Sequence, residues 1–434
     1  MKKNTFLKYF IKTLKEAKFL IIKYVIVGLY LIVSGVVTNR LNLNNLTYYN
    51  AIITLSFFAE MIGFGFIEGF GIYINQNIQD KEKSKNYAKI GFYWTIIFSL
   101  LFIILLACFP NFIIKDVLSI DFKVEYSFYY LMVISIFLSS LLNYILELLK
   151  KLTLFKFQLI CSSIQCVLIL VGMFVLVITG GLYLNYIAII YIAVYLFCLV
   201  IAFALLTKNN VYSVNLFKVK SLRLKKREVW VVICRAFSEL VWEVGYFFIS
   251  LFILKSNVFV YNQYCYFENA LDIFNGIIFA FFNVTAIKIC RCIGAGKRNG
   301  AYNYAINSLK ATILLWIIYA IIVMSLFVPL RAGLNVELQS TALISIILFL
   351  LLSLIRFVDW NLGTYIIGQS EVYVKLGFIL EFIGAIYWII MYLLSGFIHL
   401  NIYLIYLIIA LESIFKISVN LYLLKKKKWV NKIN

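Results

Sequence analysis

Twelve apolar stretches of about 20 residues follow one another along this chain of 434 residues. A helix needs about 20 consecutive apolar residues to cross a hydrocarbon layer roughly 30 Å thick. The stretches are centred near residues 28, 60, 102, 138, 168, 194, 242, 275, 316, 352, 385 and 412. Barrel strands would be about ten residues long and would alternate apolar with polar side chains. The pattern therefore predicts an all-α integral membrane protein with twelve transmembrane helices.

The composition excludes a soluble protein. Hydrophobic residues make up 64% of the chain and charged residues only 14%, and the mean hydropathy is +0.97. A soluble domain has no interior large enough for so much apolar surface. The net charge of +21 gathers in basic segments between the apolar stretches, where contact with anionic lipid headgroups explains it. We expect membrane lipid, and not nucleic acid, as a partner.

The basic segments all fall on one side of the predicted membrane topology. They are residues 2–18, 81–89, 150–156, 218–227, 291–298 and 425–428. Because Lys and Arg are enriched in cytoplasmic loops, both termini are predicted to be cytoplasmic. We expect a protein of the bacterial plasma membrane, which is the cell inner membrane where there are two.

The only two prolines mark an internal repeat. Pro110 and Pro329 each close an apolar run, 329 − 110 = 219 residues apart, and each run opens on the triplet Asn-Tyr-Ala. The triplets begin at Asn86 and Asn303, which are 303 − 86 = 217 residues apart. Six apolar stretches fall in each half, so both halves enter the membrane with the same orientation. The sequence thus predicts two six-helix lobes related by a parallel repeat, which is typical of transporters.

The repeat divides the chain into four segments. We expect an N-lobe at 1–206, a basic cytoplasmic linker at 207–228, a C-lobe at 229–424 and a basic cytoplasmic tail at 425–434. Two lobes that enclose a cavity need no second copy, so a monomer is expected.

The sequence lacks motifs for enzymatic chemistry. Its one histidine, His399, falls in the last predicted external loop, and the eight cysteines do not have the spacing of a zinc site. It contains no phosphate loop, dinucleotide glycine pattern or GxSxG. We expect a secondary transporter of a small-molecule substrate, with no cofactor beyond a coupling ion. A membrane-embedded acyl or glycosyl transferase is the alternative from another class.

Acidic residues within the apolar stretches mark the candidate site, because an ionisable group in a membrane is costly and suggests a function. They are Glu60, Glu68, Glu147, Glu239, Glu243, Glu268, Asp272 and Asp359. Those in the seventh and eighth stretches form two pairs, Glu239 with Glu243 and Glu268 with Asp272, each spaced i, i+4 on one helix face. Paired carboxylates in a low dielectric attract a cation, as proton or sodium coupling requires.

Structural ion pairing is the alternative interpretation of these acids. Glu239 could pair with Arg235 four residues earlier, and this would give it no role in coupling. Asp359 could pair in the same way with Arg356, three residues earlier.

Three segments together resemble a known family. Residues 63–88, GFGFIEGFGIYINQNIQDKEKSKNYA, look like a glycine-rich second helix and its following loop. Residues 286–305, AIKICRCIGAGKRNGAYNYA, are similar to the equivalent segment of a second half. Residues 356–372, RFVDWNLGTYIIGQSEV, resemble a tenth-helix pattern of an Asp followed about nine residues later by Gly and an acid. These segments resemble the multidrug and toxic compound extrusion (MATE) transporters of the multidrug, oligosaccharidyl-lipid and polysaccharide exporter (MOP) superfamily.

The resemblance implies an outward-opening V of two lobes, alternating access, and export driven by sodium or protons. Asp359 matches the family's cation-binding Asp of the tenth helix, and Glu243 matches its seventh-helix Glu, with Glu239 as the alternative. A sodium ion would then bind at Asp359 and Glu243. The first-helix Asp of many members falls at or near Ser34, where no acid is available, which favours coupling through the C-lobe. Glu268 and Asp272 are supporting candidates there, and Glu60 and Glu68 are possible N-lobe acids.

Two substrate classes fit this resemblance. A multidrug exporter would carry organic, cationic or amphipathic compounds in antiport with the coupling ion, in a cavity lined partly by the abundant aromatic residues, among them 31 Tyr and 39 Phe. The runner-up is a flippase for lipid-linked oligosaccharide or polysaccharide, whose cavity should be basic to hold pyrophosphate. The charges within the apolar stretches are mostly acidic, with Arg235, Arg356 and Lys23 as exceptions.

Overall fold

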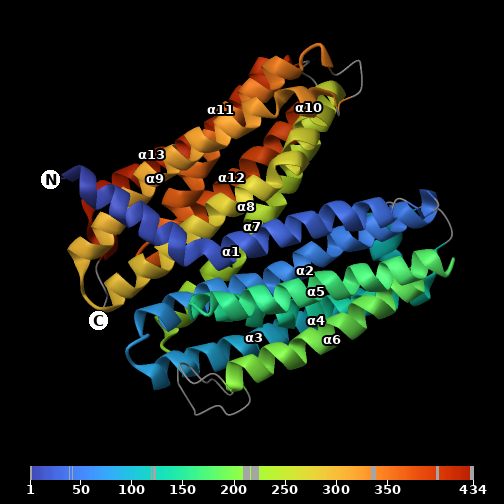
Figure 1. The fold of residues 1–434 in the computed structure, drawn as a ribbon, viewed down its shortest axis with the longest axis horizontal. Coiled ribbons are helices and arrows are strands. Elements are labelled where there is room, and N and C mark those ends of the chain that lie inside the picture. The colour runs from blue at the N-terminus through green and yellow to red at the C-terminus, as the bar shows by residue number, and fades with distance from the viewer. Residues whose placement is uncertain are drawn as a thin grey trace. The chain divides into compact units, whose positions relative to one another are not determined.

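All secondary structure is helical in the residues that the computed structural model describes, which are 2–38, 40–41, 43–118, 120, 124–208, 216, 224–332, 334, 339–396 and 400–430 (Figure 1). The α-helices are α1 Lys2–Thr38, α2 Leu43–Gln76, α3 Lys81–Cys108, α4 Tyr126–Lys151, α5 Phe155–Ile178, α6 Leu184–Thr207, α7 Lys226–Ser256, α8 Val258–Gly294, α9 Arg298–Ser325, α10 Phe327–Ala332, α11 Ala342–Trp360, α12 Val374–Leu394 and α13 Ile402–Lys426.

Within this described part of the chain, twelve helices are long and apolar enough to cross a membrane. Each of them contains one of the twelve centres predicted from the sequence. The predicted all-α integral membrane fold is therefore confirmed. Most of the basic linker predicted at 207–228, the last residues of the predicted tail and His399 lie outside the described residues.

Helices α3 and α9 confirm the internal repeat. Both have 28 residues, and they begin 298 − 81 = 217 and end 325 − 108 = 217 residues apart. Pro110 follows directly on the residue that caps α3, and Pro329 lies in α10, just after the end of α9. A proline cannot donate a backbone hydrogen bond and clashes with the preceding turn. The two prolines therefore mark the same boundary in both halves.

Contacts divide the chain into two compact units, and the division falls inside two long helices. The first unit is residues 22–236, and the second is residues 1–21 together with 237–434. The first turns of α1 thus belong with the second unit, and the first turns of α7 with the first unit. The boundaries between the two units therefore lie within α1 and α7, and not in loops.

Side chains of the repeated triplets help to hold these first helical turns. In the first unit, the Tyr87 hydroxyl of α3 donates a hydrogen bond to the Glu228 carboxylate of α7 at 2.7 Å. In the second unit, the ring of Tyr304 of α9 lies 5.7 Å from that of Tyr9 of α1, and the Tyr9 hydroxyl bonds the Thr285 hydroxyl of α8 at 2.9 Å. The Asn-Tyr-Ala triplets thus occupy equivalent positions in packing as well as in sequence.

Helix α4 is the centre of the first unit, in which α2 to α6 lie side by side (Figure 1). It packs against α2, α3, α5 and α6 and has the largest buried share among the described membrane spans. Its close approach to α2 depends on Gly63, where an added Cβ would overlap the backbone carbonyl oxygen of Ser140.

We expect Gly63→Ala to destabilise the protein by about 1–3 kcal/mol, because the overlap with backbone forces α2 and α4 apart. Thermal unfolding of the purified protein in detergent measures the effect. Gly35→Ala in α1 is the matched control, because an added Cβ there meets nothing within 4 Å. Equal melting temperatures for the two variants would contradict the close packing of α2 on α4.

The second unit has an aromatic core around α8 and α11. Its fully buried rings include Phe252, Tyr264, Phe267, Phe357 and Trp388. Helix α11 packs against α8, α9 and α13, and α12 packs against α13. Charged side chains placed among these helices are thereby surrounded by apolar rings, which sets the environment of the candidate site.

Candidate functional site

Asp359 lies at the end of α11, just before an irregular turn. Its side chain is buried, with 7% exposure. The chain continues as a π-helical turn, Asn361–Ile366, and such turns are frequent at functional sites. Asn361 anchors the turn to α9, since its amide nitrogen donates to the Thr312 hydroxyl at 2.7 Å and its amide oxygen accepts from the Ser308 hydroxyl at 3.1 Å. The position of Asp359 is therefore fixed by side chains of a neighbouring helix.

Lys416 of α13 brings two further carboxylates to this position. Its ammonium lies 2.6 Å from the Glu381 carboxylate of α12 and forms an ion pair with Glu412, one turn earlier on α13. Lys416 and the Ser413 hydroxyl are neighbours of the Asp359 carboxylate and stabilise its negative charge. We call Asp359, Glu381, Glu412 and Lys416 the carboxylate cluster. Three helices contribute to it.

The charges of the carboxylate cluster do not balance. Three carboxylates face one ammonium, which leaves a formal charge of minus two when all four groups are ionised. Uncompensated negative charge among apolar side chains is costly, and it is relieved by a bound cation or by protons. The cluster therefore has the electrostatic property that a cation-coupling site requires.

Arg356 does not neutralise the carboxylate cluster, although it lies only three residues before Asp359. Its guanidinium donates to the Tyr264 hydroxyl at 2.6 Å and lies 3.6 Å from the Glu268 carboxylate. Tyr264 in turn donates to Glu268 at 3.2 Å. The alternative interpretation paired Arg356 with Asp359, but the structure pairs it with Glu268.

A small cavity with aromatic walls adjoins the carboxylate cluster. All four cluster residues line it, together with Trp242, Tyr246, Trp360 and Trp388. The ring of Trp242 stacks on that of Tyr246 with centroids 5.6 Å apart, and it meets the ring of Trp360 edge-on at 6.4 Å. Aromatic faces attract organic cations, most strongly where water is excluded. The cavity thus combines negative charge with aromatic rings that attract cations.

Gly384 of α12 leaves room for the ion pair between Glu412 and Lys416. A Cβ at this position would lie 2.6 Å from the Glu412 carboxylate oxygen and 3.1 Å from the Lys416 ammonium nitrogen. The backbone of α12 therefore comes directly against the pair, and any side chain at this position would displace it.

We expect Gly384→Ala to lower the stability by about 1 kcal/mol, because the ends of the Glu412 and Lys416 side chains must shift. The measurement is again thermal unfolding in detergent. Gly377→Ala in the same helix is the control, since its added Cβ meets nothing within 4 Å. A Gly384→Ala variant as stable as the control would show that the ion pair is not held in this place.

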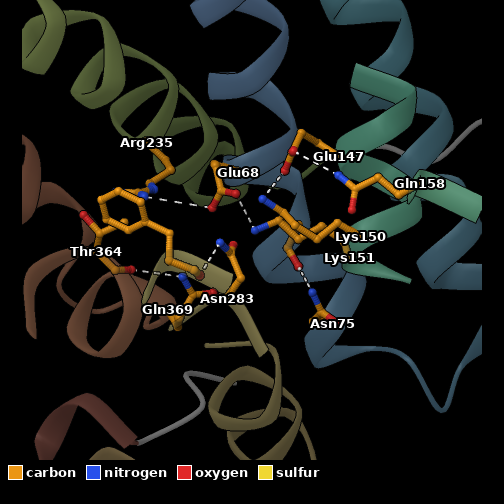
Figure 2. Close-up of polar contacts among 12 residues, drawn as sticks. Glu68, Asn75, Glu147, Lys150, Lys151, Gln158, Arg235, Asn283, Thr364 and Gln369 are labelled. Carbon is orange, nitrogen blue, oxygen red and sulfur yellow. Dashed lines mark hydrogen bonds and ion pairs between the residues drawn. The ribbon is translucent and has the colours of Figure 1, made fainter. Parts of the chain in front are cut away.

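A second group of buried charges lies in the first unit (Figure 2). The Glu68 carboxylate of α2 lies 2.6 Å from the Lys151 ammonium of α4 and 3.9 Å from the Arg235 guanidinium of α7. All three side chains are less than 9% exposed. Glu68, predicted as an N-lobe acid, is thus surrounded by positive charge and joins three helices.

The last turn of α4 adds another pair to this group. Lys150 forms an ion pair with Glu147 on the same helix, and the Gln158 amide of α5 donates to the Glu147 carboxylate at 3.3 Å. Their place in the basic segment 150–156 predicted that Lys150 and Lys151 lie in a cytoplasmic loop. The structure instead buries both, with 2% and 4% exposure. We call Glu68, Glu147, Lys150, Lys151 and Arg235 the basic cluster, because three positive charges meet two negative ones.

Glu60, the other predicted N-lobe acid, lies apart from the basic cluster in a polar region of the first unit. Its carboxylate accepts a hydrogen bond from the Ser139 hydroxyl of α4 at 2.6 Å. Tyr191 and Tyr195 of α6 interact electrostatically with it. The Tyr191 hydroxyl also bonds that of Tyr49 at 2.8 Å. Among the described residues, the Glu60 carboxylate is therefore held by neutral polar side chains, including the Ser139 hydroxyl and the Asn143 amide.

Of the predicted C-lobe acids, only Asp359 belongs to the carboxylate cluster. Glu268 is in the ion pair with Arg356, and Asp272 of α8 is exposed, with Asn275 as a hydrogen-bonding neighbour. Glu239 and Glu243 are half-buried on α7. Glu243 is not among the residues that line the cavity, although Trp242 and Tyr246 beside it are.

Sequence reasoning missed three of the four residues in the carboxylate cluster. Glu381, Glu412 and Lys416 lie inside the eleventh and twelfth apolar stretches, where the rule that selected Asp359 also applies. The i, i+4 spacing of Glu412 and Lys416 was a further signal, because opposite charges at that spacing meet on one helix face. Their contact with Asp359 depends on the packing of α11, α12 and α13, which no local pattern indicates.

Comparison with solved structures identifies the fold. The chain is similar to a MATE transporter crystallised in complex with MaL6, with a TM-score of 0.80 and 13% sequence identity over 96% of this chain and 95% of that one. It is also similar to the outward-facing conformation of a multidrug resistance MATE family transporter of the MOP superfamily, with a TM-score of 0.78 and 14% identity over 96% and 95% of the two chains.

A third similar structure is a MOP superfamily transporter from Pyrococcus furiosus, for which reverse polarity of the binding pocket suggests a different function. It matches with a TM-score of 0.80 and 14% identity over 97% of both chains. No family model and no curated protein sequence matches this chain. The fold is therefore that of the MATE transporters, as the resemblance implied.

Proposed function

We propose that this protein is a secondary transporter that exports organic, cationic or amphipathic compounds in exchange for a coupling cation. The carboxylate cluster carries this proposal, because it places excess negative charge in a buried position beside an aromatic cavity. The fold, shared with multidrug resistance transporters, supports it. No enzymatic step is needed to account for these features.

Coupling follows from the charge of the cluster. A bound cation relieves the repulsion among Asp359, Glu381 and Glu412. It therefore favours the access state in which these carboxylates lie closest together and bind the cation best. A cationic compound in the cavity draws on the same negative charge and so competes with the coupling ion. Competition of this kind is a free-energy coupling between two ligands, and it acts equally in both directions.

A flippase for lipid-linked saccharide is the second candidate, and the basic cluster favours it. Lys150, Lys151 and Arg235 are the kind of side chains that bind pyrophosphate, and the Pyrococcus furiosus transporter shows that pocket polarity varies within this fold. However, Glu68 and Glu147 offset two of the three positive charges. The remaining single charge is less than a pyrophosphate requires, so export of organic cations remains the primary proposal.

Efflux from liposomes tests the proposal. The purified protein is reconstituted with a fluorescent organic cation inside, and efflux is measured under a sodium gradient and, separately, under a proton gradient. Empty liposomes and reconstituted liposomes without a gradient are the controls. We expect efflux that depends on one gradient. Folded protein without efflux under either gradient would favour the flippase, which transbilayer movement of a labelled lipid-linked saccharide would then test.

A further inference from the structure

We propose that Lys416 acts as a tethered cation that takes the place of sodium in the carboxylate cluster, so that sodium is not the coupling ion of this protein. That an ion drives transport rests on the proposed function. The exclusion of sodium from the carboxylate cluster does not. The fold alone does not determine which ion is bound.

The ammonium of Lys416 already holds the oxygens that a metal ion would use. It lies 2.6 Å from the Glu381 carboxylate and contacts Glu412, and the Lys416 side chain is only 8% exposed. An ammonium has three N–H donors, and the Asp359 carboxylate is its third acidic neighbour. The cluster is thus arranged around a cation that is covalently part of the chain.

A sodium ion in the same place would meet two obstacles. Hard metal cations bind by gathering several oxygen ligands around themselves, and the carboxylates of Glu381 and Glu412 are turned toward the ammonium. The positive charge of Lys416 would also repel a second cation at short range, with little screening among apolar side chains. The cluster therefore does not fit sodium while Lys416 is charged and in place.

The packing keeps Lys416 in place. Glu412 and Lys416 are one turn apart on the same helix, so their contact is set by helical geometry. Gly384 of α12 faces them without a side chain, at a distance that leaves no room for a Cβ. A lysine that merely covered a helix surface would need no such space in the facing backbone.

No other described charge in the cavity lining replaces Lys416 in this role. Helix α11 contributes Asp359 and also Arg356, which is engaged by Glu268 and Tyr264. Helix α12 contributes Glu381, and α13 contributes Glu412 with Lys416. Helix α7 contributes Trp242 and Tyr246, which carry no formal charge at neutral pH. Removing the Lys416 charge alone should therefore leave three carboxylates with no cation of their own.

Binding of radioactive sodium to the purified full-length protein tests the proposal. We expect no saturable binding by the wild type, and saturable binding at one site per chain by Lys416→Gln. Adding Asp359→Asn to that variant should weaken sodium binding at least tenfold. The control is Lys288→Gln, which removes another paired lysine of the same unit, 2.8 Å from Glu16; it should behave as the wild type does.

Two outcomes would overturn the proposal: saturable sodium binding by the wild type, or no binding by a Lys416→Gln variant that is monodisperse and folded. If Lys416→Gln does not fold, the double variant Glu412→Gln, Lys416→Met replaces it in the test, because it removes one charge of each sign. We expect this double variant to bind sodium at the carboxylate cluster. The binding assay needs no transport. Failure of efflux under both gradients would reject the proposed function and leave the sodium result standing.

Discussion

Asp359→Asn is expected to abolish ion-driven export while leaving the protein folded and inserted in the membrane. The substitution keeps the size of the side chain and removes its charge. It reduces the net negative charge of the carboxylate cluster from two to one, so the free energy gained on cation binding becomes smaller. An ion gradient biases the access states only through that free energy, so its effect on transport falls. We expect gradient-dependent efflux from liposomes to fall at least ~100-fold.

The control for this experiment is Asp116→Asn, which removes an exposed acid of the first unit and should leave efflux unchanged. Thermal unfolding and gel filtration of both variants show whether they fold as the wild type does. Full gradient-driven export by folded Asp359→Asn would contradict the assignment of the cluster to coupling. Loss of folding in this variant would indicate that Asp359 is a structural group.

The helices and the repeat could be predicted from the sequence because the signals for both are local. A span is recognised from some 20 apolar residues in a row, and Pro110 and Pro329 end their helices wherever these lie in the fold. Asp359 could be predicted for the same reason, since a single acid in an apolar stretch is a local feature. The partners of Asp359 could not, because Glu381 and Lys416 reach it only through the packing of three helices.

For the two buried lysines of α4, the prediction from the sequence was wrong. Lys150 and Lys151 end an apolar stretch, and at such a position a basic residue usually marks a loop. Lys151 is withdrawn into an ion pair with Glu68 of α2, which is far away in the sequence, and Lys150 pairs with Glu147 on its own helix. Charge patterning along a chain therefore indicates topology, but it does not reveal which basic residues are withdrawn into ion pairs.

Glu68→Gln is expected to cause the largest loss of stability. The Glu68 carboxylate is the acidic partner of Lys151 at 2.6 Å and lies 3.9 Å from Arg235. Removing one partner from a buried ion pair leaves the other charge uncompensated, at a cost of about 3–5 kcal/mol. We expect the melting temperature in detergent to fall by about 10 °C. The pair lies at the meeting point of α2, α4 and α7, so all three helices lose a common contact.

A surface pair of the same unit provides the comparison. Glu82 and Lys85 lie 3.7 Å apart on α3, and the Glu82 side chain is 69% exposed. Exposed pairs contribute little, so Glu82→Gln should leave the melting temperature nearly unchanged. Adding Lys151→Gln to Glu68→Gln should restore part of the lost stability, because it removes one of the two positive charges that face the Glu68 carboxylate. If the double variant is less stable than Glu68→Gln alone, Lys151 packs favourably by itself, and the network is held together by more than its charge balance.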